Sequence, residues 1–390
     1  MKIGILTQQL NNNYGGLLQN YALQQVLIKM GHNPITLDWD YPVESVQRPL
    51  WKSMLMPIRD LVNGMKKKMR PTGENGWYEP SQEERKVISR NNQAFVSKYI
   101  NTTKKLLSSQ ELLDYSIEHQ LDALVAGSDQ CWRPIYTKTH LPDAFFSFAS
   151  GLQIKRLAYA ASFGTDAWEF TPEQETVCKA LAQQFDLVTV REDSGVTLCR
   201  EHLNVDATQV LDPTMLLNKE DYINIIEQEK VPQSPGNLFC YILDDTAQKQ
   251  QFIQSVASGM GLKPFTVMPK YRDESITKEI IKNHIQDCVY PGPASWLRGF
   301  MDAEMIICDS FHGCVFSIIF NKPFLVIGND ARGMSRFYSL LKMFNLESRL
   351  ILKDSINKID AQSPINWTPV NDLLYGYKSR SIDVLNTTLR

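Results

Sequence analysis

Short apolar runs alternate with longer segments of helical spacing along the first part of the chain. Each apolar run is bounded by polar or turn-forming residues, which is typical of a buried strand. The alternation itself is typical of parallel β–α–β units, in which a helix returns the chain to the same edge of a sheet. The runs predict strands at Ile3–Leu6, Ile35–Asp38, Ala123–Ala126, Arg156–Ala160, Leu187–Val190 and Gln209–Leu211.

A second series of strands begins after the loop-like stretch 231–236, which contains two prolines and a glycine. Its predicted strands are Leu238–Leu243, Pro264–Val267, Met305–Cys308 and Phe324–Ile327. We therefore predict an α/β fold with two Rossmann-like domains that face each other across a cleft. The predicted division is an N-terminal domain at 1–232, a C-terminal domain at 233–368, and a helix at 369–390 that returns to the N-terminal domain.

One segment, Trp51–Arg70, differs from its surroundings. Its apolar residues fall at helical spacing, and Lys66, Lys67, Lys68 and Arg70 crowd one end. This pattern is typical of a basic amphipathic helix. Two interpretations stay open: the apolar face packs on the N-terminal domain, or the helix makes peripheral contact with an anionic membrane surface.

The bulk composition narrows the class of protein. The 390 residues carry a net charge of -2, so no global basic field favours nucleic acid as a partner. No apolar stretch approaches the roughly 20 residues that span a bilayer. Seven cysteines without metal-ligand spacing fit free thiols in a reducing compartment, so we expect a cytoplasmic protein that needs no metal or cofactor.

Polar residues follow several of the predicted strands, where open α/β sheets place their ligands. Asn13, Tyr14, Gly15 and Gly16 form the first such turn, and paired glycines before a helix let a backbone approach a ligand. A strand-to-helix turn also needs glycine for its geometry alone, so this turn has a structural interpretation as well.

Two further clusters follow the third and fourth strands. Ser128, Asp129 and Gln130 form the first, and Ser162 and Phe163 the second. The alternative is that Ser128 or Asp129 simply caps a helix.

Arg191 ends the fifth strand, and its planar guanidinium suits a carboxylate or phosphate. A buried ion pair with a neighbouring acid is the alternative.

The strand at 305–308 leads into Ser310, Phe311, His312 and Gly313. A helix N-terminus favours neutral imidazole, so His312 can exchange a proton near neutral pH. Farther along, Arg332, Ser335 and Arg336 add hydroxyl and cationic groups, although a solvated loop would look the same. Together these residues predict a site for a small polyanion.

Taken in order, these motifs resemble the polysaccharide pyruvyltransferase family over about residues 1–345. The matching segments are 2–5, 13–16, 127–130, 190–192, 211–214, 309–313 and 322–324. The resemblance implies a GT-B-like fold and transfer of a pyruvyl group from phosphoenolpyruvate to a sugar, with a cyclic ketal formed and phosphate released. It also implies that the donor binds on the C-terminal side and the acceptor, a free or lipid-linked sugar, on the N-terminal side.

The resemblance further implies roles for single residues. His312 becomes the proton donor or phosphate contact, and Arg191 becomes the clamp for the carboxylate or phosphate of the donor. The attack by a sugar hydroxyl also needs a base, for which Asp129 is the candidate. Ser310 stands where some members of the family have an arginine, so a cation from Arg332, Arg336 or Arg298 must replace it. Two alternatives remain: a nucleotide-sugar glycosyltransferase on the same fold, and a non-catalytic protein that binds a glycan or a nucleotide.

Overall fold

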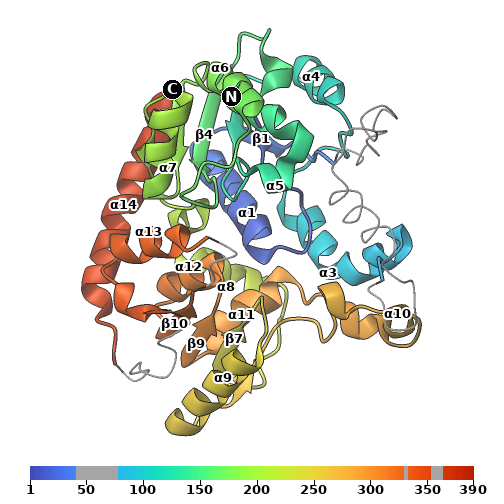
Figure 1. Cartoon of the computed structure of the whole chain (residues 1–390), viewed down its shortest axis with the longest axis vertical. Coiled ribbons are helices and arrows are strands. Elements are labelled where there is room, and N and C mark those ends of the chain that lie inside the picture. The colour runs from blue at the N-terminus through green and yellow to red at the C-terminus, as the bar shows by residue number, and fades with distance from the viewer. Residues whose placement is uncertain (41–77, 329–332, 353–362) are drawn as a thin grey trace, which may run out of the picture. The chain divides into compact units, whose positions relative to one another are not determined.

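The core of the protein consists of two parallel sheets with helices around them (Figure 1). The structure is a computed structural model that describes residues 1–40, 78–328, 333–352 and 363–390. The predicted amphipathic segment Trp51–Arg70 and the candidate Arg332 lie outside the described residues. Among the helices that are described, none has the length and apolarity to cross a membrane.

The first sheet has six strands in the order β2-β1-β3-β4-β5-β6, and every neighbouring pair is parallel. Its strands are apolar and mostly buried, as a sheet covered on both faces requires. The strand that follows β1 begins at Asn33, two residues before the predicted start. The bounds are β1 Lys2–Leu6, β2 Asn33–Thr36, β3 Ala123–Ala126, β4 Lys155–Ala161, β5 Leu187–Val190 and β6 Thr208–Gln209.

Helices follow these strands and carry clear start signals. Asn13 caps the first helix by accepting a hydrogen bond from the backbone N–H of Gly16, and Thr171 forms a capping box with Gln174. The bounds are α1 Tyr14–Lys29, α3 Gln82–Tyr99, α4 Ser109–Glu118, α5 Pro134–Thr137, α6 Pro172–Ala182, α7 Asp193–Leu198 and α8 Lys219–Gln228.

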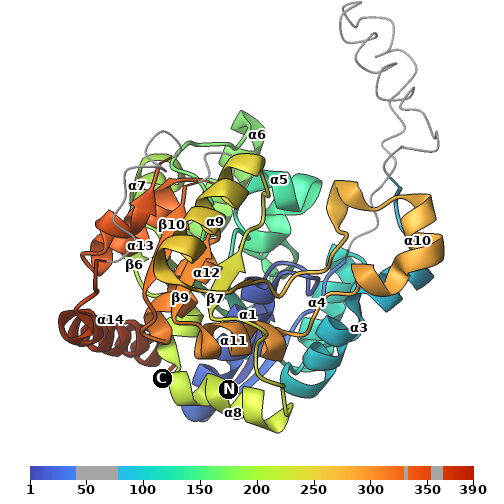
Figure 2. The ribbon, with the colours of Figure 1, turned by 90° about the horizontal axis from the view of Figure 1, so that it is seen from below.

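The second sheet is parallel in the order β11-β10-β9-β7-β8, and helices surround it (Figure 2). Residues of α9 share a buried apolar cluster with the central strands, while α11 packs Trp296 and Phe300 against β7. The strand bounds are β7 Leu238–Tyr241, β8 Pro264–Phe265, β9 Met305–Cys308, β10 Phe324–Ile327 and β11 Leu350–Ile351. The helix bounds are α9 Ala247–Met260, α10 Lys278–His284, α11 Pro293–Asp302, α12 Phe311–Ile319, α13 Ser335–Met343 and α14 Trp367–Thr388.

The last helix, α14, contacts the first sheet rather than only the second. The hydroxyl of Ser381 accepts a hydrogen bond of 3.1 Å from the backbone N–H of Leu211, just after β6. Lys155 at the start of β4 donates to the carbonyl oxygen of Thr388 at 2.6 Å. The predicted return of the C-terminal helix is therefore present; α14 is the red helix in Figure 1.

The chain divides into two compact units. The first consists of residues 1–40, 92–267 and 291–390 and contains both sheets. The described part of the second consists of 78–91 and 268–290, with an apolar core of Ile88, Ile276, Ile281 and Cys288. The division into domains at residue 232 stays a prediction.

A buried ion pair fixes the turn between β7 and α9. The carboxylate of Asp309, fully buried after β9, accepts hydrogen bonds from the backbone N–H groups of Leu243 and Asp244 and from Lys249, whose Nζ lies 2.6 Å away. Breaking such a pair from one side leaves a charge buried without its partner.

We expect Asp309→Ala to lower the free energy of unfolding by about 3–5 kcal/mol, because Lys249 would stay buried without its counter-ion. Urea denaturation measures the change. Lys29→Met is the control, because the pair between Lys29 and Asp221 is exposed and should contribute less than about 1 kcal/mol. Equal losses in the two variants would contradict the expectation.

Candidate functional site

The carboxyl ends of β1, β3, β4 and β5, the loop after β6 and the start of α12 bring their polar side chains together within the first unit. The sequence predicts this gathering, because parallel strands end at the same edge of a sheet. Five of the predicted residues meet there directly: Asn13, Ser128, Asp129, Arg191 and His312. The residue that joins most of them is Asp212, to which the sequence analysis gives no role.

Asp212 is buried at the end of the β6 loop and is held from both sides. Its Oδ1 accepts hydrogen bonds from the backbone N–H of Thr214 at 3.0 Å and from its hydroxyl at 2.7 Å. Its Oδ2 accepts from Ser128 and from Nη1 of Arg191, each at 2.9 Å. Burial alone would raise the pKa of Asp212, but His312, Arg191 and Thr214 together hold it well below its usual range.

Arg191 lies among three carboxylates. Its Nε donates to Glu192 at 3.0 Å, its Nη1 to Asp212, and its Nη2 lies 3.8 Å from Oδ1 of Asp129. Burial would lower the pKa of Arg191, but these neighbours outweigh it and raise the pKa. The guanidinium also stacks on the ring of Phe311, 4.1 Å from its centroid. No acceptor among the described residues makes a hydrogen bond with Nη2, which is therefore a buried donor without a hydrogen-bond partner there.

His312 lies in the first turn of α12, whose N-cap is Ser310. Its Nε2 is 3.5 Å from Oδ2 of Asp212, which is within ion-pair distance, but it makes no hydrogen bond with the described residues. The other side of the ring lies against Gly15, because a Cβ at that position would be only 2.0 Å from Nδ1. Gly15 is thus needed for the approach of the imidazole, which is a structural role of the kind that the sequence left open for this turn.

Asp129 has a backbone conformation that few aspartates adopt. Its φ is +72°, in the left-handed region, and the strain is balanced by local hydrogen bonds. Asn13 donates to Oδ2 at 2.9 Å, and the backbone N–H of Gln130 donates to Oδ1 at 2.9 Å. The helix cap of α1 and the turn after β3 therefore hold this carboxylate together.

Arg336 supplies a second buried guanidinium, from α13. Burial, followed by the positive charge of Arg191, lowers the pKa of Arg336 to about 10. Gly333 packs so closely on the carbonyl oxygen of Gly164 that a Cβ would be 1.9 Å from it. This contact brings the start of α13 to the loop after β4, and Ser335 begins the helix there.

Several predicted binding residues have packing roles instead. Tyr14 is fully buried, stacks on Trp296 and donates a hydrogen bond to the carbonyl oxygen of Pro291 at 2.7 Å. Phe163 lies in an aromatic cluster with Trp132 and Trp168. Burial in these clusters accounts for both rings without a ligand.

Two other predicted residues support their neighbours. Gly313 allows α12 to approach β9, since a Cβ would be 2.8 Å from the Cβ of Cys308. Ser162 donates to Glu192 at 2.8 Å and so helps to hold the acid that pairs with Arg191. Asp212 and Glu192 were missed as site residues, although both follow short apolar runs in the same way as Asp129.

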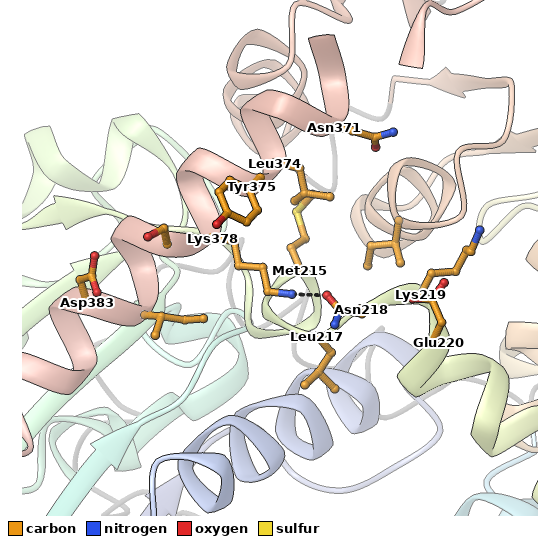
Figure 3. Close-up of a pocket in the computed structure, with 13 residues that line it drawn as sticks. Met215, Leu217, Asn218, Lys219, Glu220, Asn371, Leu374, Tyr375, Lys378 and Asp383 are labelled. Atoms are coloured by element: carbon orange, nitrogen blue, oxygen red, sulfur yellow. Dashed lines mark hydrogen bonds between the residues drawn. The ribbon is translucent and has the colours of Figure 1, made fainter. Parts of the chain in front are cut away.

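A separate pocket of about 520 Å³ lies between α14 and the start of α8 (Figure 3). Met215, Leu217 and Ile319 give it apolar walls, and Lys378 donates to Asn218 at 2.6 Å across it. The pocket is lined by residues other than those around Asp212. Within the described parts of the chain, no three His, Cys, Asp or Glu side chains gather as a metal site would require.

The fold is of the GT-B type, with two Rossmann-like sheets. The chain is similar to the crystal structure of UGT89C1 from Arabidopsis thaliana, which was solved with UDP-L-rhamnose. The two sequences are 10% identical, the TM-score is 0.51, and the match covers 99% of this chain and 98% of the other. UDP-GlcNAc 2-epimerase from Neisseria meningitidis is also similar, with 11% identity, a TM-score of 0.46 and coverage of 99% of each chain. At these identities the likeness concerns the fold alone.

The family is shown by sequence. A family model described as polysaccharide pyruvyl transferase matches residues 13–331, and the chain belongs to this family. It is therefore a transferase enzyme, and the resemblance noted in the sequence is confirmed. A search of curated proteins gave no match.

We expect Gly15→Ala to destabilise the protein by about 1–3 kcal/mol, because the new methyl group would overlap the imidazole of His312. Thermal or urea unfolding measures the loss. Gly259→Ala is the matched control: it is in α9 with open space around it, and alanine there should stabilise the helix by about 0.5–1 kcal/mol. A fully stable Gly15→Ala protein would show that the ring does not occupy this space.

Proposed function

We propose that this enzyme transfers a pyruvyl group from phosphoenolpyruvate to two hydroxyls of a sugar and releases phosphate. The acceptor belongs to a polysaccharide or to its lipid-linked precursor. The observation that carries the proposal is the meeting of Arg191, Arg336 and His312 in one buried site at the carboxyl ends of the strands. Guanidinium and imidazole groups suit an anion with both a carboxylate and a phosphate.

The charges in the site are nearly balanced, because two guanidiniums face three carboxylates, namely Asp129, Glu192 and Asp212. Affinity for an anionic donor must therefore come from directed N–H groups rather than from a strong positive field. The buried Nη2 of Arg191 and the N-terminus of α12 are such groups. Arg191 keeps the role of donor clamp in this proposal.

The reaction needs a proton at one carbon and a nucleophile at its neighbour. His312 gives a proton to the C3 methylene of the donor, while the first sugar hydroxyl attacks C2 and loses its proton to Asp129. The second hydroxyl then displaces phosphate from C2 and closes the cyclic ketal; its proton passes to the neutral His312, and Asp129 gives its proton to the departing phosphate. The phosphate leaves with the C2–O electron pair, and the arginines stabilise its charge.

Arg336 is our choice for the cation that replaces the arginine some members of the family have at Ser310. It is buried beside Arg191, and Asp129 and Glu192 influence its pKa. The other described candidate, Arg298, donates instead to Asp302 at 2.7 Å on its own helix.

The seven cysteines are all buried and free, which supports the proposal of a reducing, cytoplasmic location. The nucleotide-sugar glycosyltransferase and the non-catalytic binding protein remain the competing functions, and the first experiment below separates them.

Phosphoenolpyruvate should stabilise the protein, and UDP-sugars should not. At 100 times its dissociation constant a ligand contributes about 2.7 kcal/mol to stability, which a thermal shift detects readily. Phosphate release with a panel of free and lipid-linked oligosaccharides then tests turnover. Stabilisation by a UDP-sugar alone would favour the glycosyltransferase, and glycan binding without phosphate release would favour the non-catalytic protein.

Arg336→Met should weaken binding of phosphoenolpyruvate by about tenfold or more, which corresponds to at least about 1.4 kcal/mol and is typical of a lost charged hydrogen bond. Calorimetry measures the dissociation constant. Arg298→Met is the matched control and should leave the constant within about twofold, because Arg298 pairs with Asp302. Equal weakening by both variants would remove Arg336 from the donor site.

A further inference from the structure

The two ring nitrogens of His312 have different surroundings. Nε2 is buried and makes no hydrogen bond with the described residues, but Oδ2 of Asp212 lies within ion-pair distance of it, at 3.5 Å. The Nδ1 side of the ring lies against the Cα of Gly15, at the turn where the first sheet leads into α1. A histidine can present only one nitrogen to a substrate when the other is held by the protein.

Asp212 is well suited to hold one nitrogen, because its own orientation is fixed. Thr214 occupies Oδ1 with two hydrogen bonds, so the carboxylate cannot rotate without losing both. This leaves Oδ2 directed at Ser128, Arg191 and His312. The low pKa of Asp212 keeps it an acceptor at every pH near neutrality.

We propose that Asp212 is a positioning residue that keeps a proton on Nε2 of His312, so that Nδ1 is the nitrogen that exchanges a proton with the substrate. The inference deepens the function proposed above and rests on it for the identity of the substrate. In the donor step the imidazolium loses its Nδ1 proton to the C3 methylene and keeps its Nε2 proton toward Asp212. The neutral ring that remains has its lone pair on Nδ1, and this nitrogen is protonated again before the next turnover.

The arrangement also gives Gly15 a defined task. Since the Nδ1 side of the ring lies where a side chain at position 15 would begin, any larger residue would push the working nitrogen out of place. Asp212 and Gly15 thus lie on different sides of the ring. Asp212 acts on it through its negative charge, and Gly15 leaves space for it because it has no side chain.

Nitrogen NMR of the histidine rings tests the tautomer directly, without substrate. The signal of His312 is assigned as the one missing in His312→Gln. In the wild-type protein we expect the neutral ring to carry its proton on Nε2. A wild-type ring protonated on Nδ1 overturns the proposal, whatever the variants do.

Asp212→Asn should populate both tautomers and lower turnover by about 100-fold or more, the scale of a lost or misdirected acid–base group. The Michaelis constant for phosphoenolpyruvate should change much less than turnover. Asp186→Asn is the matched control: it makes the same change at a carboxylate outside the site, which accepts a hydrogen bond of 2.8 Å from the backbone N–H of Arg156, so tautomer and turnover should stay. A folded Asp212→Asn protein with the wild-type tautomer or turnover would contradict the proposal.

Failure of this inference differs from failure of the proposed function. A wild-type enzyme that releases no phosphate from phosphoenolpyruvate with any acceptor contradicts the function, while the tautomer still decides the role of Asp212. An active enzyme with the Nδ1–H tautomer contradicts only the inference.

Discussion

The contact between Asp212 and Arg191 is the interaction on which the site depends. Both groups are buried, so each would be strongly unfavourable without the other. The protein can bury the charged carboxylate of Asp212 because Thr214 and Ser128 also donate hydrogen bonds to it. The same carboxylate lies beside His312 of α12, the helix that follows β9 of the second sheet. One charge therefore connects residues at the ends of two strands of the first sheet with a helix that follows the second.

Under the proposed function, such a site would recognise an anionic donor by the direction of its hydrogen bonds rather than by net charge. The charges of its two guanidiniums are offset by the neighbouring carboxylates. An anion that misses Nη2 of Arg191 would therefore gain little from the surrounding field. The balance also explains why the overall composition, at a net charge of -2, gave no hint of an anion site.

The strands and the main site residues could be predicted because they depend on local pattern. Buried parallel strands are short apolar runs, and polar residues that follow them gather at one edge, which located Arg191 and His312. The role of Gly15 could not be predicted, because the ring that needs its space is about 300 residues away in the sequence. Tyr14 looked like a ligand residue for the same reason: its partners Trp296 and Pro291 belong to the other half of the chain.

The hydrogen bond between Ser381 and Leu211 has a consequence for how the protein is made. All strands of the first sheet have been synthesised once β6 has left the ribosome, but the loop that carries Asp212 obtains this anchor only 170 residues later. Until α14 has been synthesised, that loop lacks its hydrogen bond to Ser381. The site is completed late, when α14 folds back on the strand that was finished long before it.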